Sequence, residues 1–238
     1  MNKNEMQPTG PAADLAGSLP LFPPQPGIAS DGRVLGNALR LPDFGQKYLV
    51  FNRIGVPGQV HVYRADCRAG DRLRAQIFAP VLPLGGSISP RFAIVAQSLP
   101  YSADVHQLPF DLPAGFSAVV APEHRKPLAP VTDLLTRVNY HPGPVVDTRT
   151  LVGGRCYVVV WSPQNQMGKY VLQTGHRWPV RLSYWAQIPR FWWQIRGWFG
   201  QSRAVAYIAL TGLLLATFWL LLRNREGVEG MDNDKVTG

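Results

Sequence analysis

Cys156-Tyr-Val-Val-Val-Trp161 decides the fold of this chain, because β-branched and aromatic residues fill almost the whole stretch. Such residues favour a strand, and Gly153-Gly154 delimits the stretch on its amino side. Six other segments share this composition, with an apolar period of two instead of 3.6. They are residues 47–53, 59–65, 72–78, 92–96, 116–120 and 169–173.

Glycine and proline separate these segments at short intervals, as in Gly55-Val-Pro-Gly58 and Leu112-Pro-Ala-Gly115. Regular turns between short strands are typical of antiparallel sandwiches and jelly rolls. No segment between them carries the apolar stripe of a helix, which argues against alternating strands and helices. The sequence therefore predicts an all-β, jelly-roll-like antiparallel β-sandwich over residues 31–180.

Several of these motifs also resemble a known family. Val60-His-Val-Tyr63 precedes Ala69-Gly-Asp-Arg-Leu73, and Gly154-Arg-Cys-Tyr157 precedes Gly168-Lys-Tyr-Val-Leu172. This arrangement resembles the bacterial pre-peptidase C-terminal type of β-sandwich, although the chain adds a long segment at 97–153. The resemblance implies that the last two segments form a closing hairpin, and it implies an extracytoplasmic accessory or binding module.

Residues 204–222 form an apolar run without a charge, between Arg203 and Arg223. As a helix the run would be roughly 28 Å long, close to the ~30 Å hydrocarbon core of a bilayer. Its leucines and other large apolar residues contribute on the order of −3 to −6 kcal/mol of insertion free energy. We expect a single transmembrane helix, in which Gly212 and Ala216 present a small-residue face for helix packing or simply face lipid.

Residues 181–203, just ahead of this run, contain four of the seven tryptophans of the chain. Indole rings favour the lipid headgroup region, and neighbouring arginines can reach phosphates. We expect an amphipathic interfacial helix, although the same aromatics could instead pack beneath the folded domain. The predicted interface residues are Trp185, Arg190, Trp192, Trp193, Arg196 and Trp198.

The two ends of the chain read as unstructured. Residues 1–30 are rich in Pro and Gly and show no apolar periodicity, which indicates a flexible leader, and residues 223–238 read as a polar tail. No signal peptide is evident, so the literal topology is a tail-anchored membrane protein with a cytoplasmic domain. The family resemblance favours the extracytoplasmic side instead, with a start codon placed downstream of a true signal, and both topologies stay open.

Catalytic chemistry has little support in the sequence, which lacks HExxH, GxSxG, P-loop and GxGxxG motifs. We therefore expect a non-enzymatic protein with no cofactor and no metal. The alternative is a metal-binding, carbohydrate-binding or hydrolase accessory module at the rim of the sandwich. The residues that could converge there are Asp104, His106, His124 and Trp161.

Cys67 and Cys156 both lie on predicted strands that could be neighbours in a sandwich. A disulfide requires Cα atoms within about 7 Å of each other, so the sequence leaves a disulfide and a pair of buried thiols equally open.

The net charge of +9 is spread along the chain, and no nucleic-acid-binding module accompanies it. We therefore expect no nucleic-acid partner. The expected partners are the lipid bilayer and a membrane or extracytoplasmic protein, which a single-pass membrane-anchored sandwich would bind or scaffold.

Overall fold

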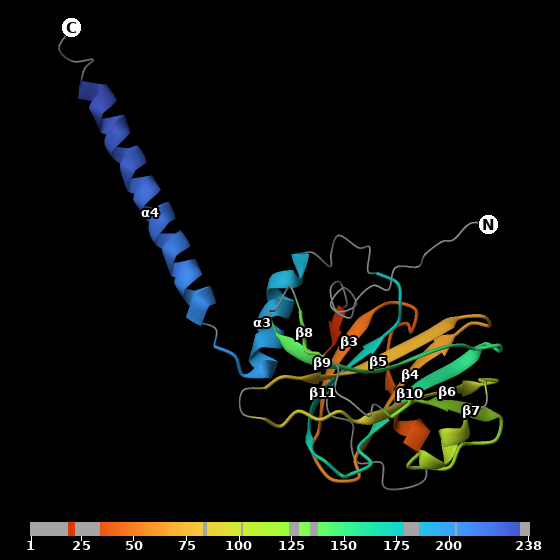
Figure 1. The fold of residues 1–238 in the computed structure, drawn as a ribbon. Coiled ribbons are helices and arrows are strands. Elements are labelled where there is room, and N and C mark those ends of the chain that lie inside the picture. Colours follow the sequence, from red (N-terminus) through yellow and green to blue (C-terminus); the bar gives the residue numbers. More distant parts are fainter. Residues whose placement is uncertain are drawn as a thin grey trace, which may run out of the picture. The chain divides into compact units, whose positions relative to one another are not determined.

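The computed structural model describes residues 19–21, 34–82, 85–100, 102–123, 129–133, 138–178, 186–202 and 204–233. Within them the chain forms two β-sheets (Figure 1). The order of the six-stranded sheet is β1 (Leu19–Leu21), β3 (Tyr48–Ile54), β11 (Gly168–Thr174), β5 (Arg72–Pro80), β9 (Asn139–Arg149) and β8 (Val131–Thr132). The order of the five-stranded sheet is β2 (Leu39–Arg40), β4 (Val60–Cys67), β10 (Gly154–Trp161), β6 (Arg91–Gln97) and β7 (Phe116–Val120).

All seven predicted strand segments are strands in the structure, and they form β3, β4, β5, β6, β7, β10 and β11. Neighbouring strands pair antiparallel except for β1 with β3 and β2 with β4, which pair parallel. The prediction of a mainly antiparallel, two-sheet β protein is therefore confirmed.

The closing hairpin implied by the family resemblance is wrong. β10 pairs with β4 and β6, whereas β11 pairs with β3 and β5 in the other sheet. The chain therefore crosses from one sheet to the other between these strands. Sequence motifs identified both strands correctly but could not show which partners they choose, because pairing depends on strands far away in the chain.

Alternate residues of each strand divide the apolar side chains between two clusters. On β4, Tyr63 and Ala65 belong to the core between the sheets, together with Val158 of β10 and Leu172 of β11. Val62 points to the opposite face of the five-stranded sheet. There a second cluster forms with residues from 3₁₀ helices η1 (Val34–Asn37) and η2 (Ala103–Gln107) and from the loop after η2. The strands of this sheet are consequently buried on both faces, which explains their nearly continuous apolar runs.

β9 is the long strand that the sequence did not predict. Its sequence Asn139-Tyr-His-Pro-Gly-Pro144 contains two prolines, which cannot donate ladder hydrogen bonds and normally argue against a strand. The structure accommodates them at a register shift between Gln76 and Phe78 of β5. A Cβ atom at Gly143 would lie 2.8 Å from the carbonyl oxygen of Ile77, so the two backbones approach closely here.

The ends of the chain differ in part from expectation. Leu19–Leu21, within the predicted leader, form β1 and pair with β3. The rest of residues 1–30 lies outside the described part of the chain. The predicted tail is also helical as far as Asn233, because α4 spans Ala204–Asn233.

The chain divides into two compact units, residues 1–192 and residues 193–238. Helix α3 (Ile188–Phe199) runs across this division and α4 belongs to the second unit. Trp193 contacts Tyr207 edge-on, with ring centroids 5.5 Å apart. Among the described residues, no helix combines the length and the apolar content needed to cross a membrane. The structure does not describe the side chains of some residues in the predicted span 204–222.

Candidate functional site

Two adjoining pockets lie at the end of the five-stranded sheet where β6 begins and β10 ends. They have volumes of about 210 and 420 Å³ and share Arg91, Ser162 and Pro163. Arg91 is the first residue of β6, and the other two directly follow the last residue of β10. We call this pair of pockets the rim groove. Its other wall residues are Gly58, Gln59, Val60, Ser89, Pro90, Gln107, Pro109, Ala121, Pro122, Glu123, Pro144, Trp161, Gln164, Asn165 and Gln166.

A chain of polar contacts positions Arg91 between the two pockets. Its Nη1 group donates a hydrogen bond to Oε1 of Gln107, and Nε2 of Gln107 donates one to Oδ1 of Asp104 at 2.9 Å. Nε of Arg91 is buried and has no hydrogen-bond partner within the described residues. Asp104 is therefore linked to Arg91 through the amide of Gln107.

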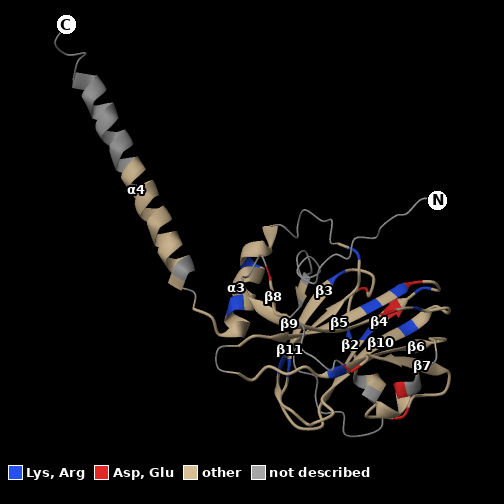
Figure 2. Cartoon of the chain, viewed as in Figure 1, with Lys and Arg blue, Asp and Glu red and all other residues tan. Residues whose placement is uncertain are grey.

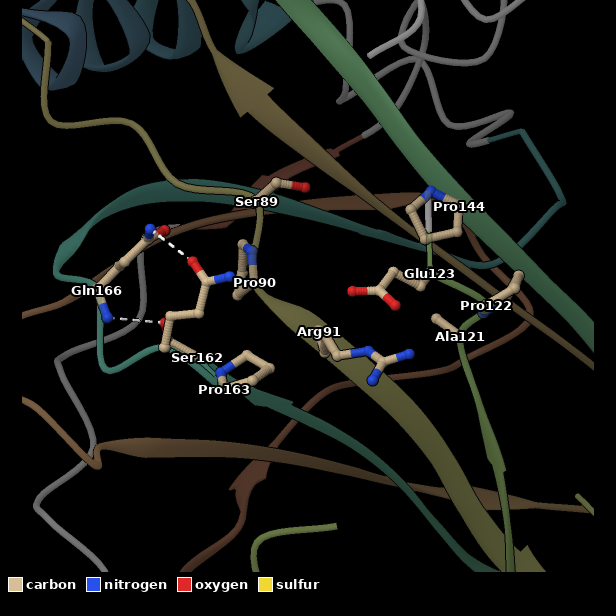
Figure 3. Close-up of a pocket in the computed structure, with 11 residues that line it drawn as sticks. Ser89, Pro90, Arg91, Ala121, Pro122, Glu123, Pro144, Ser162, Pro163 and Gln166 are labelled. Carbon is tan, nitrogen blue, oxygen red and sulfur yellow. Dashed lines mark hydrogen bonds between the residues drawn. The ribbon is translucent and has the colours of Figure 1, made fainter. Parts of the chain in front are cut away.

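The charge of Arg91 is not neutralised by an ion pair in the described part of the chain. The ion pairs recorded there join Arg40 to Asp66, Arg72 to Asp147 and Arg177 to Asp43, all outside the groove. Glu123 lines the smaller pocket together with Arg91 (Figure 3), but the two form no ion pair. The larger pocket contains no acidic residue, so Arg91 is its only charged wall residue among those described.

Hydrogen bonds within the loop that follows β10, and from this loop to a distant turn, hold the loop in shape. Backbone N–H of Gln166 donates to Oγ of Ser162 at 2.9 Å (Figure 3). Oδ1 of Asn165 accepts a hydrogen bond from the backbone N–H of Gly58 at 3.1 Å, which ties this loop to the turn before β4. Asn165 itself has φ +54°, a conformation that asparagine tolerates better than most residues. The groove wall is thus formed by ordered backbone.

The structure brings together only part of the predicted rim constellation. Trp161 lines the larger pocket. Asp104 is hydrogen-bonded to Gln107, which also lines this pocket. His106 is exposed on η2, and His124 lies outside the described residues. Within the part of the chain that the structure describes, no three His, Cys, Asp or Glu side chains converge as metal ligands would.

Trp161 is also a poor candidate for stacking against a sugar ring. Only 4% of its surface is exposed, and the ring packs in the outer apolar cluster with Val159 and Tyr157. A ring buried in this way has no free face for a ligand. The sequence did not single out Arg91 or Gln107, because an isolated Arg after a proline and an isolated Gln in a proline-bounded segment carry no motif.

A buried polar network joins the two sheets at the centre of the sandwich. The hydroxyl of Tyr170 on β11 shares hydrogen bonds with Nδ1 of His61 at 2.5 Å and with the hydroxyl of Tyr63 at 2.9 Å. Nδ2 of Asn52 donates to the Tyr63 hydroxyl at 2.8 Å. Burial lowers the pKa of His61 to about 4 and raises the pKa of Tyr63 to about 12. All four side chains are shielded from solvent, so the network is structural and offers no site to a ligand.

The two cysteines are free buried thiols, which resolves the alternative left open by the sequence. In the pairing of β4 with β10, Cys67 lies opposite Gly154 and Cys156 opposite Ala65, so the thiols are diagonal neighbours on one face. A hydrogen bond to Cys156, together with burial, raises the pKa of the Cys67 thiol well above its ordinary value.

The predicted membrane-facing residues fall on α3 and α4. Trp192, Trp193 and Trp198 are partly buried on α3, and Arg190 is exposed; Trp185 lies outside the described residues. Arg196 donates a hydrogen bond from Nη2 to the carbonyl oxygen of Ser202 at 2.8 Å. On α4, a Cβ atom added at Gly212 would meet nothing within 4 Å, and Ala216 is exposed. The interfacial and helix-packing roles of these residues stay predictions.

No protein-family model matches this chain, and no curated protein matches its sequence.

Proposed function

We propose that this chain is a single-pass, membrane-anchored β-sandwich protein that binds a protein partner and carries out no catalysis. In this proposal residues 204–222 cross the bilayer, residues 181–203 lie at its surface, and the sandwich uses its rim groove to hold an extended, carboxylate-bearing segment of the partner. The extracytoplasmic side is the favoured location of the sandwich, in line with the family resemblance.

The exposed apolar surface of α4 is the observation that carries the proposal. Leu213, Leu214 and Leu215 are 62%, 60% and 63% exposed, although successive helix residues point about 100° apart. Ile208 and Phe218, 71% and 60% exposed, extend the same surface along the helix. No charged residue lies among residues 207–220 of α4, whose side chains the structure describes (Figure 2). A helix that is apolar on every side is stable only when something apolar surrounds it, and a lipid bilayer does so for a single helix.

The segment before α4 supports the same proposal. α3 concentrates tryptophan and arginine over a single short helix, in keeping with the predicted interfacial segment. Elsewhere Lys and Arg are scattered over the sandwich and do not gather in one basic stripe (Figure 2), which gives no support to nucleic-acid binding.

The strand order supports the finer prediction of a jelly roll. β3, β11, β5 and β9 are consecutive in one sheet, and β4, β10, β6 and β7 are consecutive in the other. This order follows when two Greek-key halves of one chain are wound across two sheets. Jelly rolls host many unrelated functions, so the topology by itself favours none of them.

The rim groove supports binding of a partner's carboxylate. Arg91 is held in place by Gln107, retains unused N–H donors, and has no acidic neighbour in the larger pocket. An Asp or Glu side chain seated in this pocket would form charge-assisted hydrogen bonds with the guanidinium. The prolines of the smaller pocket would then contact the adjoining residues of an extended segment, and Glu123 would favour a basic or N–H group there.

Alkaline carbonate extraction of membranes that contain the full chain tests the anchor. We expect the parent chain to stay in the membrane pellet. Leu214→Arg places a charge near the bilayer centre at a cost of about 2.5 to 3.5 kcal/mol, so a substantial fraction should move to the supernatant. Leu214→Ile is the matched control and should stay in the pellet. Release of the parent chain, or equal retention of all three chains, would contradict the anchor.

Peptide binding to the detergent-solubilised full chain tests the groove. The probes are two degenerate pools of extended peptides that differ only at the central position, Asp or Glu in one and Asn or Gln in the other. We expect the parent to bind the acidic pool at least about tenfold more tightly than the amide pool, because a hydrogen bond to a charged group contributes more binding free energy than one to a neutral group. Arg91→Met should abolish the preference.

Arg53→Met is the control for this measurement, because Arg53 is exposed and lines neither pocket of the groove. It removes the same charge and should leave the preference unchanged. The groove proposal fails if the parent binds both pools equally or if the two variants lose the preference to the same extent. Neither result would affect the carbonate extraction, so anchor and groove are tested separately.

A further inference from the structure

A third pocket, of about 370 Å³, lies at the opposite end of the sandwich from the rim groove. β11 begins next to the loop that walls the rim groove and ends next to His176, which lines this third pocket. The start of β5 and the end of β9 provide Arg72 and Arg149. Arg177, Asp71, Gly45 and Gly70 complete the wall, so three arginines and a histidine from three separate strand ends meet here.

The strand register places two of these arginines directly opposite each other. Arg72 of β5 pairs with Arg149 of β9, and like charges in such positions repel. Asp147 neutralises the charge of Arg72 and not that of Arg149. Its carboxylate accepts hydrogen bonds from both Nε and Nη2 of Arg72, the first at 2.8 Å. Arg149 is exposed, and its side chain forms no ion pair with the described residues.

The remaining wall residues leave further donors available. Arg177 uses Nη2 to reach Asp43 at 3.2 Å, which leaves most of the five N–H groups of its guanidinium free. Nδ1 of His176 is buried and has no hydrogen-bond partner within the described residues. Burial lowers the pKa of His176, and the charges of Arg72 and Arg177 lower it further. A neutral His176 can still donate from Nδ1 in one of its tautomers.

Asp71 is the one acidic wall residue among those described, and it is committed to its own turn. Its Oδ2 accepts a hydrogen bond from the backbone N–H of Arg68 at 2.8 Å, and its backbone N–H donates to the carbonyl oxygen of Arg68 at 3.1 Å. Since Arg72 and Arg177 already face carboxylates, Arg149 supplies the unneutralised charge of the pocket.

We propose that this pocket binds a phosphate group, with Arg149 as the main charged contact and Arg72, Arg177 and His176 as additional donors. Guanidinium groups recognise phosphate through paired N–H donors. The donors here come from three chain segments around the pocket, which suits an anion that presents oxygens in several directions, as a tetrahedral phosphate does. The phosphate could belong to a soluble molecule or to a lipid headgroup.

Titration with inorganic phosphate at constant ionic strength tests this site in the full chain, reconstituted in phosphatidylcholine nanodiscs. The readout is the midpoint of thermal unfolding, which rises saturably when a ligand binds the folded state alone. We expect saturable stabilisation of the parent and an apparent Kd at least tenfold weaker for Arg149→Met. Arg53→Met, which removes an exposed arginine outside this pocket, should keep the parent's Kd within twofold.

Phosphatidic acid in the same nanodiscs distinguishes the two sources. If the lipid headgroup occupies the pocket, the apparent Kd for inorganic phosphate should rise severalfold in the parent but not in Arg149→Met. If the ligand is soluble, phosphatidic acid should leave that Kd unchanged, and either result supports a phosphate site. Unsaturable stabilisation of the parent, or equal weakening in Arg149→Met and Arg53→Met, would overturn the proposal.

Discussion

At the scale of single residues, the centre of the sandwich contains an ionisable side chain that the fold keeps neutral. His61 is fully buried and shares its hydrogen bond with Tyr170, which lies on the other sheet. Its Nε2 atom has no hydrogen-bond partner within the described residues, so protonation would place an uncompensated charge in the core. The sequence showed only an isolated histidine on a strand. Its protonation state follows from burial, which depends on the packing of both sheets.

The pH dependence of stability should report this histidine. The pKa of His61 is about 4 in the folded chain and lies near its ordinary value of 6.5 in the unfolded chain. Between these values the unfolded chain binds the extra proton, so the free energy of unfolding falls as the pH falls from 6.5 to 4. The full effect is about 3 kcal/mol, at 1.36 kcal/mol for each pKa unit.

Urea unfolding of the parent and of His61→Gln between pH 7 and pH 4.5 measures this effect. The parent should lose stability steadily across the range, and His61→Gln should lose much less. The pKa of His176 is also lowered, so His176→Gln is the control and should retain most of the parent's slope. Identical slopes for the parent and His61→Gln would refute the assignment.

At the scale of elements, turn glycines set how far the strands continue. Gly175 directly follows β11 and has φ +79°, which allows Arg177 to form a bridge with Gln46 just before β3. A Cβ atom here would lie inside van der Waals contact with the carbonyl oxygen of Gln46 and 2.9 Å from that of Phe44. Glycine is thus required at position 175 for two reasons, its backbone conformation and the close approach of the segment that precedes β3.

Gly58 provides a matched comparison, because it has φ +74° and nothing lies within 4 Å of its added Cβ atom. Gly58→Ala should cost only the conformational penalty, about 1 to 2 kcal/mol. Gly175→Ala should cost that penalty and roughly 1 to 3 kcal/mol more from the steric overlap. Urea unfolding of the two variants measures the difference, and equal losses would show that the chain relieves the overlap without cost.

The elements also show where local patterns succeed and where they mislead. Alternation and β-branched residues identified seven strands, because these signals come from the residues of each strand alone. β9 was missed, since its prolines and glycine are poor strand residues and only the irregular register with β5 tolerates them. The short strands β1, β2 and β8 were missed because two or three residues carry no period.

At the scale of the whole molecule, the rim groove and the third pocket depend on contacts between distant parts of the chain. Arg91 meets Gln107 and the loop after Trp161, and Arg72 meets Arg149 and His176. None of these combinations forms a motif in the sequence. The sequence did predict a site at the rim from Asp104 and Trp161. The groove is centred on Arg91, however, and Trp161 forms part of its apolar wall.

The sequence by itself determined the strand-rich character of residues 31–180, most of the strand positions and the uncharged apolar run at 204–222, since each is a property of neighbouring residues. Tertiary structure alone decided the order of strands in the two sheets, the crossing from β10 to β11 and the grouping of side chains in the rim groove and the third pocket. The physical reason is that a strand's side chains indicate which face is buried, whereas its backbone hydrogen bonds suit many partners. Which partner it takes depends on packing across the entire core.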